Sequence, residues 1–284
     1  MWFVNGDKTS KALVSASIVL YKTDPRLLDR VLACVLSSSV DKLWIIDHSP
    51  AKCLDYKLPD SDRIVYKRAR NRGYGAGNNI AINESIKEGF KYHLVLNPDV
   101  YWKGDIISEL IRFMDANPDV ALVMPRVYYP DGEFQYQARL LPTPADLFFR
   151  RVNKNFNRER HVDRYELRHA DWDKIINAPF LSGCFMFLRN EVLKEIGGFD
   201  ERFFMYHEDM DFTRRLHSRG RTVYYPAVSI YHNLERASSK SLKLFFIHVV
   251  SMLKYFNKWG WFSDPKRDEV NNATLARIAG DKNN

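Results

Sequence analysis

The sequence predicts an α/β protein with a Rossmann-like, mostly parallel sheet that is flanked by helices. Over the first 125 residues, buried strand-like runs alternate with helix-like runs. Repeated strand–helix–strand units of this kind form parallel sheets with helices on both faces. The chain has 284 residues, 45% of them hydrophobic and 27% charged. That is the composition of a globular protein with a sizeable core, and it excludes disordered, collagen-like and disulfide-scaffold proteins.

The first half of the chain supplies most of the predicted sheet. Residues 13–20 (LVSASIVL) are rich in β-branched side chains and favour a buried strand. Thr23-Asp24-Pro25 then marks a helix start, and apolar residues follow at helical spacing up to Leu36. The same reasoning predicts further strands at 43–47, 63–67, 93–97 and 120–125, and helices at about 78–88 and 104–114.

The second half departs from this alternation. The turn signal YYPDG at 128–132 predicts a β-hairpin within 127–139. Residues 140–175 are basic, aromatic and poorly periodic, and we expect a long excursion there. The remaining predicted elements are strands at 180–188, 222–225 and 228–232, helices at 190–196 and 208–219, an aromatic helix at 240–262, and a frayed polar tail beyond 266.

Composition also narrows the classes of function. The three cysteines, Cys34, Cys53 and Cys184, have no CxxC spacing, which argues against disulfides and zinc knuckles and fits a reducing cytosol. No apolar run approaches the roughly 18 residues of a spanning helix, and the N-terminus lacks a signal-peptide core, so we expect a cytoplasmic protein. The net charge of +8 points to a polyanionic partner. No nucleic-acid-binding signature is present, so we exclude nucleic acid in favour of a phosphorylated ligand or an anionic membrane.

Four short segments contain polar residues or glycines that could bind a ligand or take part in catalysis. The glycine-rich stretch 71–79 (NRGYGAGNN) lies between a strand and a helix, where backbone can approach a ligand closely. Asn97-Pro98-Asp99 follows a strand and suits a hard cation, although it can equally be a simple turn. Three acids in 208–211 open a helix as a candidate base or merely as partners of the helix dipole. His232 ends a strand as a candidate metal ligand or a structural histidine.

The order of these patterns supports their functional interpretation. Between residues 17 and 232, the chain resembles glycosyltransferase family 2, the inverting sugar-nucleotide transferases with the GT-A fold. The most specific piece is GGFDERFFMYHEDMDFTRRL at 197–216. LNPD at 96–99 together with NRGYGAGNN is most similar to the rhamnosyltransferase and galactofuranosyltransferase branch.

The resemblance implies a role for each matching residue. Asp209 matches the catalytic base, with Glu208 and Asp211 as its neighbours. Asp99 and His232 match ligands of a divalent cation, Mn²⁺ or Mg²⁺, whereas Asn97 stands where an aspartate is usual. The positions that match the pocket of the donor nucleotide and sugar are Tyr21, Asp47, Asn71, Gly73, Asn79, Ser182 and Gly183. Arg72 and the backbone amides of the glycine turn can add to the stabilisation of the leaving diphosphate.

We therefore expect an inverting, metal-dependent glycosyltransferase of cell-surface polysaccharide biosynthesis. Deoxythymidine-diphosphate rhamnose is the first donor to test and uridine-diphosphate sugars the next, with a saccharide or lipid-linked acceptor. The expected organisation is a transferase domain over 1–239, with a nucleotide-binding half at about 1–125 and an acceptor-binding half at about 126–239, followed by a C-terminal segment at 240–284. A non-catalytic sugar-nucleotide or carbohydrate-binding protein of the same fold is the alternative. Lysines and aromatics in 240–262 suit either an interfacial helix on anionic lipid or a core or dimer helix.

Overall fold

A computed structural model describes residues 13–50, 57–149, 156–233 and 241–280. Its central sheet has the strand order β3-β2-β1-β4-β10-β6-β11-β5, and β8 pairs with Val223 and Tyr224 of β11. Neighbours β3, β2, β1 and β4 are parallel, as are β6 and β11, whereas β10 runs antiparallel to both β4 and β6. The sheet is therefore mixed and mostly parallel, as the sequence predicts. Its strands are β1 Val14–Leu20, β2 Lys42–Asp47, β3 Ile64–Arg68, β4 Tyr92–Leu96, β5 Val100–Tyr101, β6 Val120–Tyr128, β8 Ile176–Asn177, β10 Phe185–Arg189 and β11 Arg221–His232.

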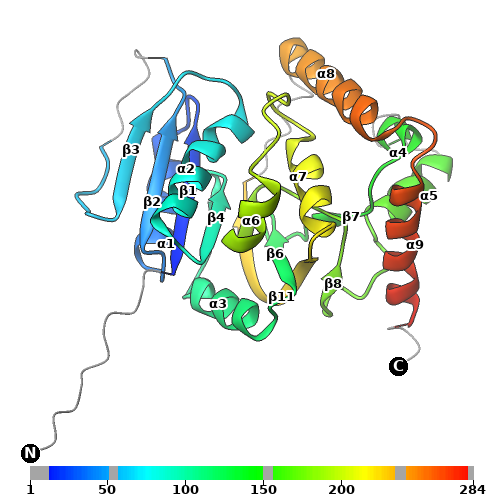
Figure 1. Cartoon of the computed structure of the whole chain (residues 1–284), viewed down its shortest axis with the longest axis horizontal. Helices are drawn as coiled ribbons and strands as arrows, with labels where there is room; N and C mark the ends of the chain where they lie inside the picture. Colours follow the sequence, from blue (N-terminus) through cyan, green and yellow to red (C-terminus); the bar gives the residue numbers. More distant parts are fainter. Residues whose placement is uncertain (1–12, 51–56, 150–155, 234–240, 281–284) are drawn as a thin grey trace, which may run out of the picture.

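Helices cover this sheet and extend beyond one end of it (Figure 1). Every residue of β1 is buried, as expected for a central strand that is covered on both faces. Helix α1 begins as predicted, because the Asp24 side chain caps it and Pro25 opens its first turn. The helices are α1 Pro25–Leu36, α2 Tyr74–Glu88, α3 Ile106–Ala116, α4 Pro144–Phe149, α5 Phe156–Tyr165, α6 Asn190–Ile196, α7 Glu208–His217, α8 Leu242–Trp259 and α9 Pro265–Gly280.

A second, two-stranded antiparallel sheet pairs β7 (Ala138–Arg139) with β9 (Phe180–Leu181). The predicted hairpin at 127–139 is present in short form, because Tyr128 and Phe134 form an antiparallel bridge, Tyr129 N–H donates to the Glu133 carbonyl and Gln135 N–H donates to the Val127 carbonyl. The predicted strand 180–188 is in fact two strands, because the chain leaves the small sheet at Leu181 and enters the central sheet at Phe185. The predicted strands 222–225 and 228–232 are one irregular strand whose register shifts between Tyr225 and Ser229.

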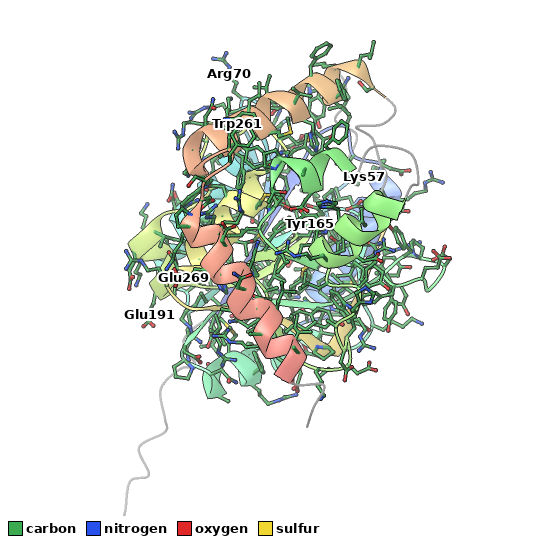
Figure 2. All side chains as sticks on the ribbon, turned by 90° about the vertical axis from the view of Figure 1, so that its right-hand side faces the viewer. Lys57, Arg70, Tyr165, Glu191, Trp261 and Glu269 are labelled. Atoms are coloured by element: carbon green, nitrogen blue, oxygen red, sulfur yellow. The ribbon has the colours of Figure 1, made fainter. Side chains whose placement is uncertain are left out.

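The prediction for one poorly periodic segment was incomplete, and the prediction for another was wrong. The excursion 140–175 contains α4 and α5, and the ring of Tyr165 at the end of α5 is buried inside the molecule (Figure 2). The tail beyond 266 is helix α9, although its polar sequence shows no apolar stripe. Asn271 holds α9 in place, since its amide donates to and accepts from the backbone of Leu141 at 2.8 Å each. The buried, bidentate pair of Arg214 with Asp264 fixes the start of the same helix.

Cys34 and Cys184 are free thiols, as expected. Cys53, the N-terminal residues 1–12 and the basic residues Arg150 and Arg151 lie outside the described residues.

Candidate active site

Polar residues gather where the parallel strands end. Asp47 is the last residue of β2, and its buried carboxylate accepts hydrogen bonds from Ser49 N–H and the Tyr66 hydroxyl, both at 2.7 Å. Tyr21 follows β1 and is exposed. Lys22 N–H donates to the Ser49 hydroxyl and so ties the loops after β1 and β2 together. Ligands of α/β proteins bind at this edge of the sheet.

Glycines of the turn 71–79 lie against other parts of the protein. Gly73 adopts φ +108°, and a Cβ on it would lie 2.1 Å from the carbonyl oxygen of Phe204. A Cβ on Gly75 would lie 2.7 Å from the Phe199 side chain. Tyr74 N–H donates to the Phe204 carbonyl at 2.9 Å, and α2 begins there, four residues before its predicted start. These two glycines therefore allow the close approach of the 197–204 loop, where the sequence had suggested the approach of a ligand.

Asn79 fastens the same loop. Its Oδ1 accepts from Phe199 N–H at 2.7 Å, and its Nδ2 donates to the Phe199 carbonyl at 2.9 Å and to Glu201 at 3.1 Å. Arg72 forms an exposed ion pair with Glu201 at 2.9 Å, and Asn71 accepts from Gly73 N–H. The amide of Asn79 thus has a structural use, and its contact with a nucleotide stays a prediction.

Asp209 lies on the first turn of α7, beside the chain segment between the two sheets. Its Oδ2 accepts from Gly183 N–H at 3.0 Å, and its Oδ1 accepts from Met210 N–H at 2.8 Å. The Tyr74 hydroxyl donates to the Gly183 carbonyl at 2.9 Å. Gly183 therefore lies directly against Asp209, and the contact of residues 182–183 with a donor sugar stays a prediction. The approach is close enough that a Cβ on Gly183 would lie 3.0 Å from the Cβ of Asp209.

Burial makes the acids at this helix start hard to ionise. Burial and the neighbouring Asp209 charge raise the pKa of Glu208 well above its usual value of 4.5. Burial also raises the pKa of Asp209, but the N–H groups of Gly183 and Met210 and the charge of Arg139 oppose this rise. Oε2 of Glu208 has no hydrogen-bond partner among the described residues. Of this coupled pair, Asp209 is thus the acid better able to hold a negative charge, as a base must.

The side chain of Asp211 belongs to a different set of contacts from that of Asp209. It is fully buried and bonds to Arg215 at 2.9 Å, to Lys258 at 2.6 Å and to the indole N–H of Trp259 at 2.7 Å. These contacts fasten α8 to α7. Although Asp211 was predicted as a neighbour of the base, its contacts are those of a structural residue.

Asp99 and His232 meet at the edge of the sheet, with Oδ1 and Nε2 3.5 Å apart. Both atoms are buried and make no hydrogen bond within the described part of the chain. The amide nitrogen of Gln135 donates to the His232 carbonyl, so its oxygen is left to accept from His232 Nδ1 at 3.2 Å. With Nδ1 donating to Gln135, Nε2 is the ring atom directed at Asp99, and it could bind a cation there on losing its proton, in the orientation of metal-binding histidines.

This pair fits a divalent cation as two of its ligands. Burial disfavours a proton on His232, but Cys184 and Asp99 outweigh it and raise the pKa of this histidine to about 10, so the pocket favours positive charge. Within the described ranges, no group of three or more His, Cys, Asp or Glu side chains is arranged around a metal position. The other ligands would have to come from the diphosphate and water. Asn97 lies nearby, and its backbone N–H donates to the carbonyl of Cys184.

Several residues near the site were not predicted: Tyr74, Gln135, Gln137 and Arg139. The last three follow each other at every second position, so an extended chain turns them to one side. The Gln137 amide donates to the Gln135 side chain at 2.8 Å, and the positive charge of Arg139 acts to lower the pKa of Asp209. The alternating FQYQAR pattern at 134–139 was a signal that the sequence offered for this polar wall.

Comparisons with known proteins agree with this arrangement. An N-acetylglucosaminyl-diphospho-decaprenol L-rhamnosyltransferase of Mycobacterium tuberculosis is 27% identical over 193 residues, which are 64% of this chain and 60% of that protein. The rhamnosyltransferase WbbL of Escherichia coli (strain K12) is 27% identical over 210 residues, 70% of this chain and 75% of WbbL. The chain thus spans less than two thirds of the length of the mycobacterial relative.

Solved structures share the GT-A fold at low sequence identity. S. aureus TarS 1–349 in complex with UDP has a TM-score of 0.53 and 13% identity, covering 93% of this chain and 71% of TarS 1–349. GalNAc-T7 with UDP, GalNAc and Mn²⁺ has a TM-score of 0.56 and 14% identity, covering 78% of this chain and 43% of that one. The family model described as glycosyl transferase family 2 matches residues 18–197. The chain belongs to glycosyl transferase family 2.

Proposed function

We propose that the chain transfers a sugar from a nucleotide-diphosphate sugar to an acceptor hydroxyl, with inversion at the anomeric carbon. The observation that carries this proposal is the setting of Asp209, a half-buried carboxylate held by two N–H groups at the carboxyl edge of the sheet. The acceptor oxygen attacks as its proton passes to Asp209, and the diphosphate leaves from the opposite face. A single displacement of this kind inverts the configuration. Inversion is tested by the anomeric coupling constant of the product, and a retained configuration would contradict the proposal.

The leaving diphosphate is expected at the Asp99–His232 pair. Asp99 Oδ1 and His232 Nε2 are the two atoms that would hold Mn²⁺ or Mg²⁺. When bound, such a cation offsets the negative charge that develops on the diphosphate. Gln135 keeps His232 in the required orientation through Nδ1. Tyr21, Asp47 and the backbone around Gly183 are proposed to bind the nucleotide and the donor sugar.

The relatives guide the choice of substrates. Because two of them are rhamnosyltransferases, deoxythymidine-diphosphate rhamnose is the first donor and uridine-diphosphate sugars are the second. The mycobacterial name also suggests a lipid-linked acceptor. We propose a role in cell-surface polysaccharide assembly at the cytoplasmic side of the membrane, with residues 1–125 holding the nucleotide and 126–239 the acceptor.

One observation favours a second candidate function. Asn97 replaces one of the acids expected near the cation, which would suit a protein that binds a sugar nucleotide without transferring the sugar. A transfer assay with a radiolabelled donor separates the two functions, because the non-catalytic protein binds the nucleotide but forms no product.

Thermal melting identifies the nucleotide. UDP, dTDP, GDP and CDP are each added with and without Mn²⁺, and a ligand at about 100 times its Kd stabilises the fold by roughly 2.7 kcal/mol. We expect one nucleotide to raise the Tm only when the metal is present. Asp99→Ala should abolish this metal-dependent rise in Tm. Asp60→Ala, which changes an exposed aspartate outside the site, should keep it. No shift with any nucleotide would contradict the proposed donor class.

A further inference from the structure

Helix α8 carries an apolar face on its outer side. The exposed fractions are 79% for Leu242, 63% for Phe246, 46% for Val250 and 40% for Leu253. Their spacings of four, four and three residues place these side chains along one stripe of the helix. A surface helix of a globular protein normally turns polar side chains to this side. Figure 2 shows α8 lying across one end of the molecule, just before the labelled Trp261, with side chains standing away from the body.

The charged side chains of α8 itself all have one sign. Residues 236–263 contain no Asp or Glu, and α8 itself contains Lys243, Lys254 and Lys258. Lys243 and Lys254 are exposed and lie eleven residues apart, about three helical turns, so both flank the same edge of the stripe; the amine of Lys254 also donates to the Arg202 carbonyl. Lys258 instead turns inward to Asp200 and Asp211. An apolar stripe bordered by lysines is the pattern of a helix that lies in the interface of an anionic bilayer.

The inner side of α8 contacts the loop that leads to the proposed base. The Ser251 hydroxyl donates to the Met205 carbonyl at 2.8 Å, and the rings of His248 and His207 lie 4.6 Å apart. His207 immediately precedes Glu208 and Asp209. Because a helix is about 10 Å across with its side chains, this loop lies only about that far from the outer stripe.

We propose that the outer face of α8, formed by Leu242, Phe246, Val250 and Leu253 with Lys243 and Lys254, binds an anionic lipid bilayer. Within the described residues no helix is both long and apolar enough to cross a membrane. The consequence for activity rests on the proposed function: the bound protein holds its site next to acceptors anchored in that bilayer.

Electrostatics argue for lipid over a second copy of the chain. A symmetric dimer places the same face of both subunits together. Two α8 helices paired in this way would bring Lys243 and Lys254 near their own copies, and α8 offers no acid to compensate them. A bilayer with anionic headgroups supplies the missing opposite charge.

Vesicle co-sedimentation of the full chain, without donor or acceptor, tests the proposal. We expect binding to vesicles of phosphatidylcholine with phosphatidylglycerol, weaker binding to phosphatidylcholine alone, and a decrease at high salt. The triple variant Leu242→Ser/Phe246→Ser/Val250→Ser should bind at least about tenfold more weakly, because it removes most of the inserted apolar area. Lys243→Glu should reduce the preference for the anionic lipid.

The matched control is Ile175→Ser, an equally apolar residue that is 44% exposed but lies just before β8. It should bind like the unchanged protein. An unchanged Tm confirms that each variant is folded. The proposal is overturned if the unchanged protein ignores anionic vesicles, if the control loses as much binding, or if sedimentation equilibrium shows a dimer that the triple variant dissociates. Because the assay contains no sugar nucleotide, its result does not depend on whether the proposed transferase activity is correct.

Discussion

Replacing Asp209 by asparagine removes the proposed base while keeping its shape. The carboxylate accepts one hydrogen bond on each oxygen, from Gly183 and Met210. The introduced amide would have a single acceptor oxygen, so one of these N–H groups would face the amide NH₂. An unsatisfied buried donor costs about 1–3 kcal/mol. Loss of the charge beside Glu208 offsets part of this cost, since the two acids repel each other in the native site.

The expected effect on the reaction is much larger than the effect on stability. A positioned general base accelerates a reaction by about 10²–10⁴-fold, which is about 3–5 kcal/mol of the barrier. Donor binding should change little, because the base contacts the acceptor. Single-turnover transfer measures the first quantity, and nucleotide-dependent melting measures the second. If the variant keeps more than about a tenth of the transfer rate, Asp209 is not the base, and Glu208 becomes the acid to examine.

Asp211→Asn is the control, two residues away on the same helix. It weakens the buried ion pairs with Arg215 and Lys258, and breaking such pairs costs about 3–5 kcal/mol. We expect the opposite pattern from that of Asp209→Asn: a large fall in Tm and a small change in the rate per folded molecule.

Two further predictions concern stability. The pKa of Glu208 is raised in the folded state, so its stabilising contribution is complete below about pH 4.5 and is lost as the pH rises through the raised value. Glu208→Gln should therefore flatten the decline of Tm with pH above 4.5. An unchanged slope would contradict the raised pKa of this residue. Gly73→Ala should destabilise the fold by more than about 2 kcal/mol in urea titrations, because its Cβ would meet the Phe204 carbonyl at 2.1 Å. Gly132→Ala, at φ +91° in open space, should cost only the backbone strain of about 1 kcal/mol, and equal losses for the two variants would refute the importance of the contact.

Periodicity was enough to find the elements with strong patterns. Strand β1 and helix α1 show clear periods and capping residues, and both were predicted within one or two residues. Helix α9 was missed because its sequence PKRDEVNNATLARIAG presents no apolar stripe. Its position depends on Asn271 and on the Arg214–Asp264 pair, which are polar contacts made across long stretches of the chain.

Candidate site residues could be named from the sequence, but their contacts could not be predicted. The order of motifs pointed to Asp99, Asp209 and His232, and the structure brings Asp99 and His232 within 3.5 Å of each other. Nothing in a single sequence pairs Asn79 with Phe199, which lies 120 residues further along the chain. For the same reason the glycines of 71–79 were interpreted as ligand-facing, whereas Gly73 and Gly75 face the 197–204 loop.

That pairing has a consequence for the proposed displacement. The loop that precedes the proposed base is fixed to the start of α2 by the Tyr74–Phe204 and Asn79–Phe199 hydrogen bonds. Tyr74 also holds the Gly183 carbonyl, whose own N–H binds Asp209. Because α2 packs directly on strands β1 and β2, the proposed base and the proposed donor pocket share one support. In-line attack needs the base on the side of the donor sugar opposite the diphosphate, and a support common to both sites keeps that geometry without any help from the acceptor.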